Sequence, residues 1–346
     1  MDIINIRSDT QTLPTAAMLQ AIASAPLGDD TYEEDPTVRK LEALAAERLG
    51  KPAAMLVISG NMGNLCALMT HARPGEEVLL DPHSHIFYYE SGGLASIAGL
   101  MPMCVPTDRG LMDPQDLRSA IRGRNIHHPR PRLLCLENTH NRSGGRVVPL
   151  DLHRQLCAVA REHDLAVHLD GARIFNAAIA AGVPAAEYAR DVDSVMFCLS
   201  KGLSCPLGSV LVGERDFIDR ARWIRKRLGG GMRQAGIIAA AGIVALEQMV
   251  DRLAEDHAHA RLLAEQLNDI PGVSVDLAGV ETNIVNADHA DTGLSNAEVL
   301  QRLKSAGVLV VARPPSQVRF VVNRHHDRET VLEVARRVRS ALHPAH

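Results

Sequence analysis

The sequence lacks the features that direct a protein to nucleic acids or membranes. Its 346 residues contain 37 lysines and arginines against 41 acidic residues, which gives a net charge of −4 at pH 7. A slightly acidic chain without a basic stripe argues against a nucleic-acid partner, and no lysine- and arginine-rich amphipathic stretch indicates a membrane surface. The most apolar run, residues 235–246, falls well short of the ~20 residues that a spanning helix needs.

Cysteine and histidine patterns typical of disulfides or metal sites are missing as well. The six cysteines include no Cys-x-x-Cys pair and lie mostly inside apolar runs, so we expect buried, reduced thiols. The sixteen histidines show neither His-x-x-x-His nor His-Glu-x-x-His spacing, so the sequence predicts no metal site. Because the first residues lack the basic region and apolar core of a signal peptide, we expect a cytoplasmic protein.

What the sequence does contain is a long alternation of strands and helices. Short apolar runs alternate with stretches of helical periodicity up to residue 227, which predicts βαβ units, a mostly parallel sheet and hence an α/β fold. The strands are expected at 55–58, 77–80, 101–105, 132–136, 165–169, 194–199 and 208–212. A smaller α+β portion follows, with strands expected near 273–277, 283–286, 308–312 and 318–322.

The length of the chain predicts more than one core. We expect residues 1–35 to form an extended N-terminal arm that needs another surface to lie on, such as that of a second subunit. A large α/β domain (36–250) and a small C-terminal α+β domain (251–346) follow.

One lysine stands between two of the predicted buried strands. Residues 194–199 and 208–212 flank a polar hinge that carries Lys201. An ammonium group directly after a buried strand loses hydration, which favours the neutral, nucleophilic amine. On these residues alone, a lysine on an exposed turn is the commoner explanation, so other parts of the chain must decide.

Two further segments bring polar groups to the same edge of the predicted sheet, since open α/β sheets bind ligands outside the carboxyl ends of their strands. Asp170 ends one strand before a glycine turn and would either cap that turn or hold a cationic ring nitrogen of a cofactor. A second strand runs into a helix through Gly60 and Gly63, where the backbone would either enclose one phosphate or form an ordinary tight turn. The loop lacks the Walker lysine and a complete Gly-x-Gly-x-x-Gly.

A strand-end aspartate, a glycine-containing helix start and a strand-end lysine together meet the requirements of a pyridoxal phosphate site. The lysine amine forms a Schiff base with the cofactor aldehyde, the aspartate keeps the pyridine nitrogen protonated, and the helix start takes the phosphate. The combination favours a cofactor site more strongly than any of the three features alone.

Over essentially its whole length, the sequence resembles the low-specificity threonine aldolases, which are fold-type-I pyridoxal phosphate enzymes. The similarity is densest at 7–10 (Arg-Ser-Asp-Thr), 28–30, 35–37, 84–87, 137–141, 168–176, 198–202 and 229–236. The resemblance implies a large domain with a mostly parallel sheet and a smaller C-terminal α+β domain.

The resemblance also implies roles for individual residues. Lys201 would be the Schiff-base lysine and Asp170 the partner of the pyridinium nitrogen. His85 would stack on the cofactor ring and reach the substrate hydroxyl. His127, or its neighbour His128, would lie near the substrate side chain.

Further residues match positions that bind the two anionic groups. The substrate carboxylate would be held by Ser8, Arg173 (which also contacts the cofactor) and Arg319, because guanidinium groups grip carboxylates bidentately. Arg313 competes with Arg319, since the loop 312–318 looks longer than in some relatives. The phosphate would be held by Ser59, Gly60, Asn61 (where relatives usually have threonine) and Ser200, and by Lys226 and Arg233 of a neighbouring subunit. The alternative for Lys226 is a solvated basic helix end.

We therefore predict a pyridoxal phosphate-dependent carbon–carbon lyase. It would cleave threonine, allo-threonine and related β-hydroxy-α-amino acids into glycine and an aldehyde. β-Elimination, transamination and serine hydroxymethyl transfer use the same cofactor and are the alternatives within this fold. A nicotinamide dehydrogenase would need a fingerprint that is missing here, and a non-catalytic protein would have lost Lys201 or Asp170. Phosphate ligands shared across subunits make a dimer the minimum assembly, and the family implies a homotetramer.

Overall fold

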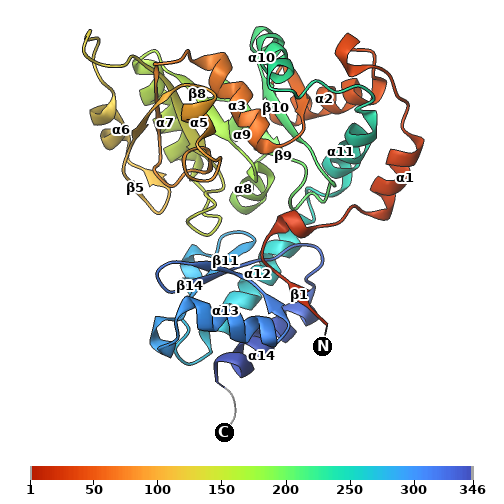
Figure 1. The fold of residues 1–346 in the computed structure, drawn as a ribbon, viewed down its shortest axis with the longest axis vertical. Helices are drawn as coiled ribbons and strands as arrows, with labels where there is room; N and C mark the ends of the chain where they lie inside the picture. Colours follow the sequence, from red (N-terminus) through yellow and green to blue (C-terminus); the bar gives the residue numbers. More distant parts are fainter. Residues whose placement is uncertain (1, 344–346) are drawn as a thin grey trace.

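A seven-stranded sheet with the order β2-β10-β9-β8-β7-β3-β4 forms the centre of the computed structural model, which describes residues 2–343 (Figure 1). Its strands are β2 (Ala53–Val57), β3 (Glu77–Leu80), β4 (Met101–Cys104), β7 (Pro131–Glu137), β8 (Ala166–Asp170), β9 (Ser194–Cys198) and β10 (Ser209–Gly213). Strand β10 runs antiparallel to both of its neighbours, whereas β4, β3, β7, β8 and β9 pair in parallel. The predicted mostly parallel sheet is confirmed.

Different helices cover the two faces of this sheet. On β9, Val195 and Phe197 belong to the core beneath α2 (Pro36–Leu49), α7 (Leu150–Glu162) and α11 (Gly236–Gln248). Met196 and Cys198 point to the opposite face, where α3 (Gly60–His71) and α10 (Arg215–Arg227) pack. Because both faces are covered, the inner strands β9 and β10 are buried at every position rather than alternating between buried and exposed residues.

Several short elements were not predicted from the sequence. They are α4 (His85–Tyr88), α5 (Gly93–Ser96), the hairpin of β5 (Thr107–Asp108) and β6 (Leu111–Met112), α8 (Ile174–Ala181) and α9 (Ala185–Ala189). Helix α6 (Pro114–Ala120) follows this hairpin. Helix α8 is apolar on nearly all sides and begins inside a buried segment, so it has no polar stripe from which a helical period could be read.

The small lobe combines three helices with a three-stranded antiparallel sheet of order β11-β14-β13. Its elements are α12 (Leu253–Asn268), β11 (Ile284–Asp288), α13 (Asn296–Ser305), β12 (Val308–Leu309), β13 (Val311–Arg313), β14 (Gln317–Val321) and α14 (Arg328–Leu342). The strand expected at 308–312 is divided into β12 and β13. The strand expected near 273–277 is wrong, because this segment forms only an isolated bridge between Ser274 and Asp288.

The N-terminal segment crosses from one lobe to the other. Strand β1 (Ile4–Asn5) pairs in parallel with β12, and Ile6 lies in the small-lobe core. Residues 16–24, which we expected to be extended, form α1 (Ala16–Ser24), which is capped by Thr15 and packs on α11 in the large lobe. Figure 1 shows the segment in red between these two ends.

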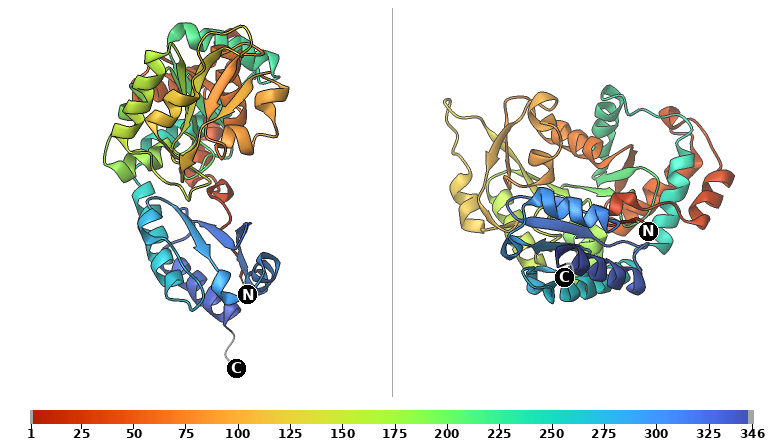
Figure 2. Two further views of the ribbon diagram at one scale, coloured as in Figure 1. Left: turned by 90° about the vertical axis from the view of Figure 1, so that its left-hand side faces the viewer. Right: turned by 60° about the horizontal axis from the view of Figure 1, so that its bottom comes forward.

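Helix α12 joins the two lobes, which Figure 2 shows one above the other in its left view. Leu253, at its first turn, belongs to the large-lobe core, whereas Ala260 and Leu263 belong to the small-lobe core. The division predicted near residue 250 therefore falls just before a helix that reaches into both cores, and the domain bounds stay a prediction.

The structure also bears on the expected burial of the cysteines and on the expectation that the chain has no spanning helix. Five of the six cysteines are buried, but Cys104 is exposed at the end of the edge strand β4. Across residues 2–343, no helix combines the length and the apolar character needed to cross a membrane.

Candidate active site

The carboxyl ends of the parallel strands form the edge of the large sheet that faces the small lobe. Asp170 ends β8 and stands in register with Glu137, which ends β7. Lys201 follows the end of β9, and α3 begins just after β2. Three separate βα or strand–loop connections therefore bring the predicted cofactor groups to one edge, as open α/β sheets do.

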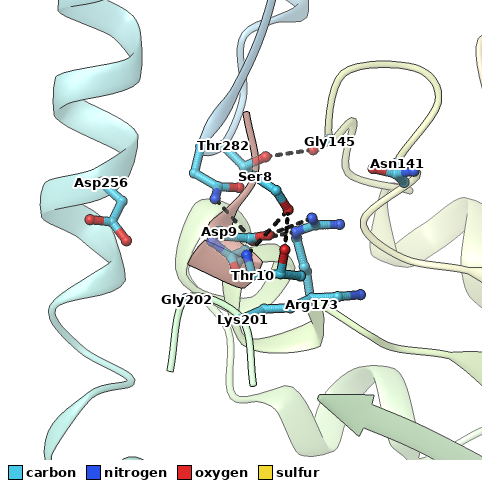
Figure 3. Close-up of polar contacts among 12 residues, drawn as sticks. Ser8, Asp9, Thr10, Asn141, Gly145, Arg173, Lys201, Gly202, Asp256 and Thr282 are labelled. Carbon is cyan, nitrogen blue, oxygen red and sulfur yellow. Dashed lines mark hydrogen bonds and ion pairs between the residues drawn. The ribbon is translucent and has the colours of Figure 1, made fainter. Parts of the chain in front are cut away.

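A cavity of about 400 Å³ lies between this edge and the small lobe. Five residues predicted to bind cofactor or substrate line it, and they come from both lobes and the N-terminal segment: Ser8, His85, Arg173, Lys201 and Arg319. Figure 3 shows Ser8, Arg173 and Lys201 beside one another. Arg313 also lines the cavity, together with Asn141, Arg142 and the aromatic residues Tyr88 and Tyr89.

Lys201 sits on a hinge that the N-terminal segment holds in place. Its backbone carbonyl accepts hydrogen bonds from the hydroxyl of Thr12 and the backbone N–H of Ser204, both at 2.8 Å. The hinge lies between two fully buried strands. The lysine side chain therefore leaves a rigid backbone and points into the cavity.

Asp170 is a buried carboxylate that lacks a basic partner within residues 2–343. It is 1% exposed and accepts hydrogen bonds only from the backbone N–H of Ala172 (3.1 Å) and the amide of Asn64 (3.0 Å). One ligand atom each of His85, Glu90 and Asp170 lie within 4.8 Å of one another. Two carboxylates this close attract a cation, either a metal ion or the protonated ring nitrogen of pyridoxal phosphate.

A buried hydrogen-bonded chain behind Asp170 fixes its orientation. The Asn64 carbonyl faces Nε2 of His168 (3.1 Å), and Nδ1 of His168 lies 2.8 Å from the Ser194 hydroxyl. That hydroxyl in turn lies 2.8 Å from Nε2 of His71. Burial lowers the pKa values of His168 and His71 to about 3, so both rings are neutral and add no charge beneath the carboxylate.

The start of α3 forms a cradle for an anion. Ser59 caps the helix by accepting from the backbone N–H of Met62 (3.3 Å). Among the hydrogen bonds of the described residues, the backbone N–H groups of Gly60 and Asn61 have no acceptor. They lie at the positive end of the helix dipole, where phosphate binds. A Cβ on Gly60 would lie 2.9 Å from Sγ of Cys198, so glycine also lets the helix start lie close to β9.

The side chain of Asn61 is directed away from that cradle. With its nitrogen toward Glu90, the carboxamide lies 3.1 and 2.9 Å from the two carboxylate oxygens. In this orientation the side chain of Asn61 bonds to Glu90, and its backbone N–H is the group available to a phosphate.

Glu90 connects His85 to the buried network. One of its oxygens lies 2.9 Å from Nδ1 of His85 and 2.7 Å from the Asn64 amide nitrogen. Burial lowers the pKa of His85, but the hydrogen bond to Glu90 and the negative charge of Asp170 outweigh it and raise that pKa above its usual value. Burial raises the pKa of Glu90, and the bond from His85 offsets part of the increase.

Asp9 holds Arg173 through a buried, two-point ion pair. Its carboxylate accepts from Nε (2.6 Å) and Nη2 (2.7 Å) of Arg173, as Figure 3 shows. Burial by itself would raise the pKa of Asp9, but the charge and hydrogen bonds of Arg173 lower it to about 2. Asn283 of the small lobe adds a third bond at 3.3 Å. With one edge of the guanidinium occupied, Nη1 is the nitrogen left to meet a ligand.

Arg319 comes from the small-lobe strand β14. Its Nη1 donates to the Asn141 side-chain carbonyl (3.0 Å) and its Nη2 to the backbone carbonyl of Arg7 (3.2 Å). Its buried Nε has no partner within the described residues. Burial and the nearby Arg173 lower its pKa, as expected for a guanidinium that awaits an anion.

Besides Asp170, Ser200 and the three residues at the start of α3, three further predicted residues do not line this cavity. His127 lies on an exposed loop, and Lys226 and Arg233, which flank the glycine run 229–231, are both exposed. Arg233 pairs with Asp29 at 3.2 Å. A Cβ on Gly230 would lie 2.3 Å from Sδ of Met62 in the first turn of α3, so this run borders the anion cradle.

The lining residues Tyr88, Tyr89, Asn141 and Arg142 were not singled out from the sequence, and neither were the buried polar residues Asp9, Asn64 and Glu90. Asp9 lies inside the segment 7–10, which carries the resemblance, but its spacing from Arg173 in the chain gives no sign of a pair. Asn64 falls one turn into a predicted helix, where the four-residue step from Gly60 could have marked it as facing the same way. Glu90 lies after two tyrosines, without any pattern that marks it as buried.

Several known proteins are similar to this chain in sequence or fold. A family model described as beta-eliminating lyase matches residues 5–290. The chain is 44% identical to low-specificity L-threonine aldolase 1 of Arabidopsis thaliana over 331 residues, which covers 94% of this chain and 92% of the relative. It is 43% identical to the low specificity L-threonine aldolase of Escherichia coli K12 over 343 residues, or 98% and 99%.

Solved structures support the fold. A threonine aldolase of Leishmania major matches with a TM-score of 0.84 at 20% identity, which covers 98% of this chain and 99% of that one. A structure of serine palmitoyltransferase with pyridoxal phosphate matches with a TM-score of 0.76 at 19% identity, over 98% and 87% of the two chains. The chain has the fold of fold-type-I pyridoxal phosphate enzymes.

Proposed function

The chain belongs to the beta-eliminating lyase family, and from this premise we propose how its residues carry out a threonine aldolase reaction. The protein is a pyridoxal phosphate-dependent carbon–carbon lyase that cleaves threonine and related β-hydroxy-α-amino acids to glycine and an aldehyde. The observation that supports the residue assignments is the cavity in which Lys201, His85 and four arginines meet.

The residues at the sheet edge would hold the cofactor at its two ends. Asp170 would accept a hydrogen bond from the protonated ring nitrogen, because its carboxylate is buried, oriented by Asn64 and without a basic partner in residues 2–343. The backbone N–H groups at the start of α3, with Ser59 and Ser200, would take the phosphate. Lys201 would attach the cofactor covalently. When bound, pyridoxal phosphate supplies an electron sink for the pair released as the Cα–Cβ bond breaks.

The arginines would orient the substrate. Arg173 and Arg319 line the cavity from the large and small lobes respectively, and within residues 2–343 Nε of Arg319 has no hydrogen-bond partner. A carboxylate held between them, with the Ser8 hydroxyl, cannot turn freely about Cα. This restriction would keep the Cα–Cβ bond in the orientation that cleavage requires.

His85 would take the proton of the β-hydroxyl. Its Nδ1 faces Glu90, so Nε2 is the nitrogen available to the substrate. The carboxylate stabilises the imidazolium that forms when Nε2 accepts the proton. His127 is exposed in its own chain, so it would reach the substrate side chain from a neighbouring subunit.

We further infer a cytoplasmic homotetramer in which Lys226 and Arg233 assist the phosphate of a neighbouring subunit. In support, the glycine run that they flank borders the start of α3. Trp223, one turn before Lys226 on α10, is 79% exposed, and exposed aromatic residues are typical of protein interfaces.

Replacing Lys201 by alanine tests the proposal. We expect turnover and the visible absorbance of the bound cofactor to be lost together, while Lys304→Ala, at an exposed position of α13, retains both. Products from threonine identify the reaction: glycine with acetaldehyde supports aldol cleavage, and 2-oxobutanoate would indicate β-elimination. Activity retained in Lys201→Ala would contradict the assignment.

A further inference from the structure

The catalytic cavity contains more positive charge than one substrate carboxylate requires. Four arginines line it, together with Lys201, and none of the lining side chains within residues 2–343 is acidic. Asp9 neutralises Arg173 from behind. Arg142, Arg313 and Arg319 make no ion pair among the described residues, whereas the threonine side chain brings no charge to balance them.

Arg313 shows this imbalance most clearly. It is only 7% exposed, and its guanidinium donates to the backbone carbonyls of Asn141 (3.0 Å) and Arg142. Burial and the nearby charges of Arg319 and Arg142 lower its pKa to about 10. A buried guanidinium that bonds to neutral carbonyls keeps most of the free-energy cost of its desolvation. An anion bound beside it would offset that cost.

Strand pairing places Arg313 beside Arg319 rather than in its place. In the β13–β14 pair, Arg319 stands opposite Val311 and Arg313 stands opposite Gln317. The two arginines are therefore diagonal neighbours on the same face of the sheet, where such positions lie about 7–8 Å apart. Both bond to Asn141, Arg319 to its side chain and Arg313 to its backbone carbonyl. The cavity thus has two adjacent guanidinium groups on one wall.

Arg142 approaches the same space from the large lobe. Its guanidinium carbon lies 4.6 Å from the centre of the Tyr88 ring, and its Nη1 donates to the Tyr89 hydroxyl at 2.9 Å. Contacts with neutral aromatic groups position the charge without cancelling it. The second guanidinium of the wall, Arg313, therefore has another cation near it and no anion among the described residues.

We propose that Arg313, assisted by Arg142, binds a second carboxylate carried on Cβ of the substrate, so that the enzyme accepts β-hydroxy-α-amino dicarboxylic acids such as 3-hydroxyaspartate. This proposal rests on the proposed function. Arg319 and Arg173 take the α-carboxylate, and Arg313 takes the carboxylate on Cβ. The β-hydroxyl loses its proton to the base and the Cα–Cβ bond breaks. Cβ becomes the carbonyl carbon of glyoxylate, Cα gains a proton to give glycine, and no oxidant is needed.

The first test compares two nearly isosteric substrates with the unmodified holoenzyme. L-3-Hydroxyaspartate and L-3-hydroxyasparagine differ at Cβ only in carboxylate against carboxamide. We expect kcat/KM to be at least about tenfold higher for the dicarboxylic acid, because charge-assisted bonds to a guanidinium are roughly twice as strong as neutral ones. Equal values, or a preference for the amide, would overturn the proposal without any question of misfolding.

The second test uses Arg313→Gln. We expect the ratio of kcat/KM for 3-hydroxyaspartate to that for threonine to fall by about 10- to 100-fold, with Arg313→Lys intermediate because it keeps the charge but loses the planar fork. Arg336→Gln, at an exposed position of α14, is the matched control. An unchanged ratio in Arg313→Gln would overturn the proposal. Failure of the unmodified enzyme to cleave threonine would instead contradict the proposed function.

Discussion

Replacing Asp9 by asparagine would test whether one buried ion pair holds the N-terminal segment and a substrate-binding arginine in place. Asp9 is fully buried and Arg173 is 7% exposed. The pair joins three parts of the chain: the segment that follows β1, the loop after β8, and Asn283 at the start of β11. The substitution keeps the shape of the side chain but removes its charge, which leaves the guanidinium buried and uncompensated.

The size of the effect follows from the geometry. The fall in the pKa of Asp9 from 3.8 to about 2 corresponds to about 2 kcal/mol of stabilisation at neutral pH. Removing one partner from a buried pair costs about 3–5 kcal/mol, because the remaining charge stays desolvated. We therefore expect Asp9→Asn to lower the free energy of unfolding by about 2–5 kcal/mol. It should also raise KM for threonine, since Arg173 is no longer held at Nε and Nη2.

Urea unfolding of the enzyme, Asp9→Asn, Arg173→Leu and the double variant measures the coupling between the two residues. The double variant should recover part of the loss, because neither charge is then buried alone. Since the pKa of Asp9 is depressed in the folded state, the contribution of its charge is present above pH 3.8 and lost as pH falls toward 2. Asp219→Asn, at an exposed position of α10, is the control. A loss below about 1 kcal/mol, or strictly additive effects, would refute the reasoning.

Two further substitutions examine the network around the cofactor. In Glu90→Gln, the rising limb of the pH profile of kcat/KM should move to lower pH, because burial then lowers the pKa of His85 without the compensating bond; a limb that stays in place would show that Glu90 does not govern this proton. In Asn64→Leu, cofactor binding followed by absorbance titration should weaken by about tenfold or more, since the carboxylates of Asp170 and Glu90 lose a shared donor. Unchanged affinity there would mean that Asp170 is oriented by other groups.

The sequence was sufficient to predict those parts of the fold in which the local residue pattern agrees with the final structure. Continuous apolar runs predicted the strands of the large sheet to within about two residues, because β9 and β10 are buried on both faces and are apolar after an initial serine in each. The position of Lys201 and Asp170 at one edge followed from the parallel arrangement alone. The resemblance then assigned roles that no spacing in the chain specifies.

The remainder of the site depends on contacts between distant segments. Asp9 and Arg173 are 164 positions apart, and their pairing requires the N-terminal segment to cross between the lobes, which neither residue type indicates. Helix α1 was missed because it is short and Met18 is its one buried residue, so its sequence shows no run of core positions with a helical period. Glu90 takes its place in the site through its bonds to Asn64 of α3 and His85 of α4, which no local sequence pattern indicates.

Asn141 explains why the substrate side of the cavity was the hardest part to predict. Its backbone N–H donates to Glu137 at the end of β7, its side chain accepts from Arg319, and its carbonyl accepts from Arg313. A single loop residue therefore sets the distance between the sheet edge and two small-lobe arginines. Because Glu137 also accepts from the backbone N–H of His85, the same carboxylate fixes the base and the loop that positions the substrate ligands. The enzyme's preference for a substrate side chain thus depends on how the two lobes meet at this residue. From the sequence, Arg313 and Arg319 were alternatives for one role, whereas in the structure both arginines line the cavity.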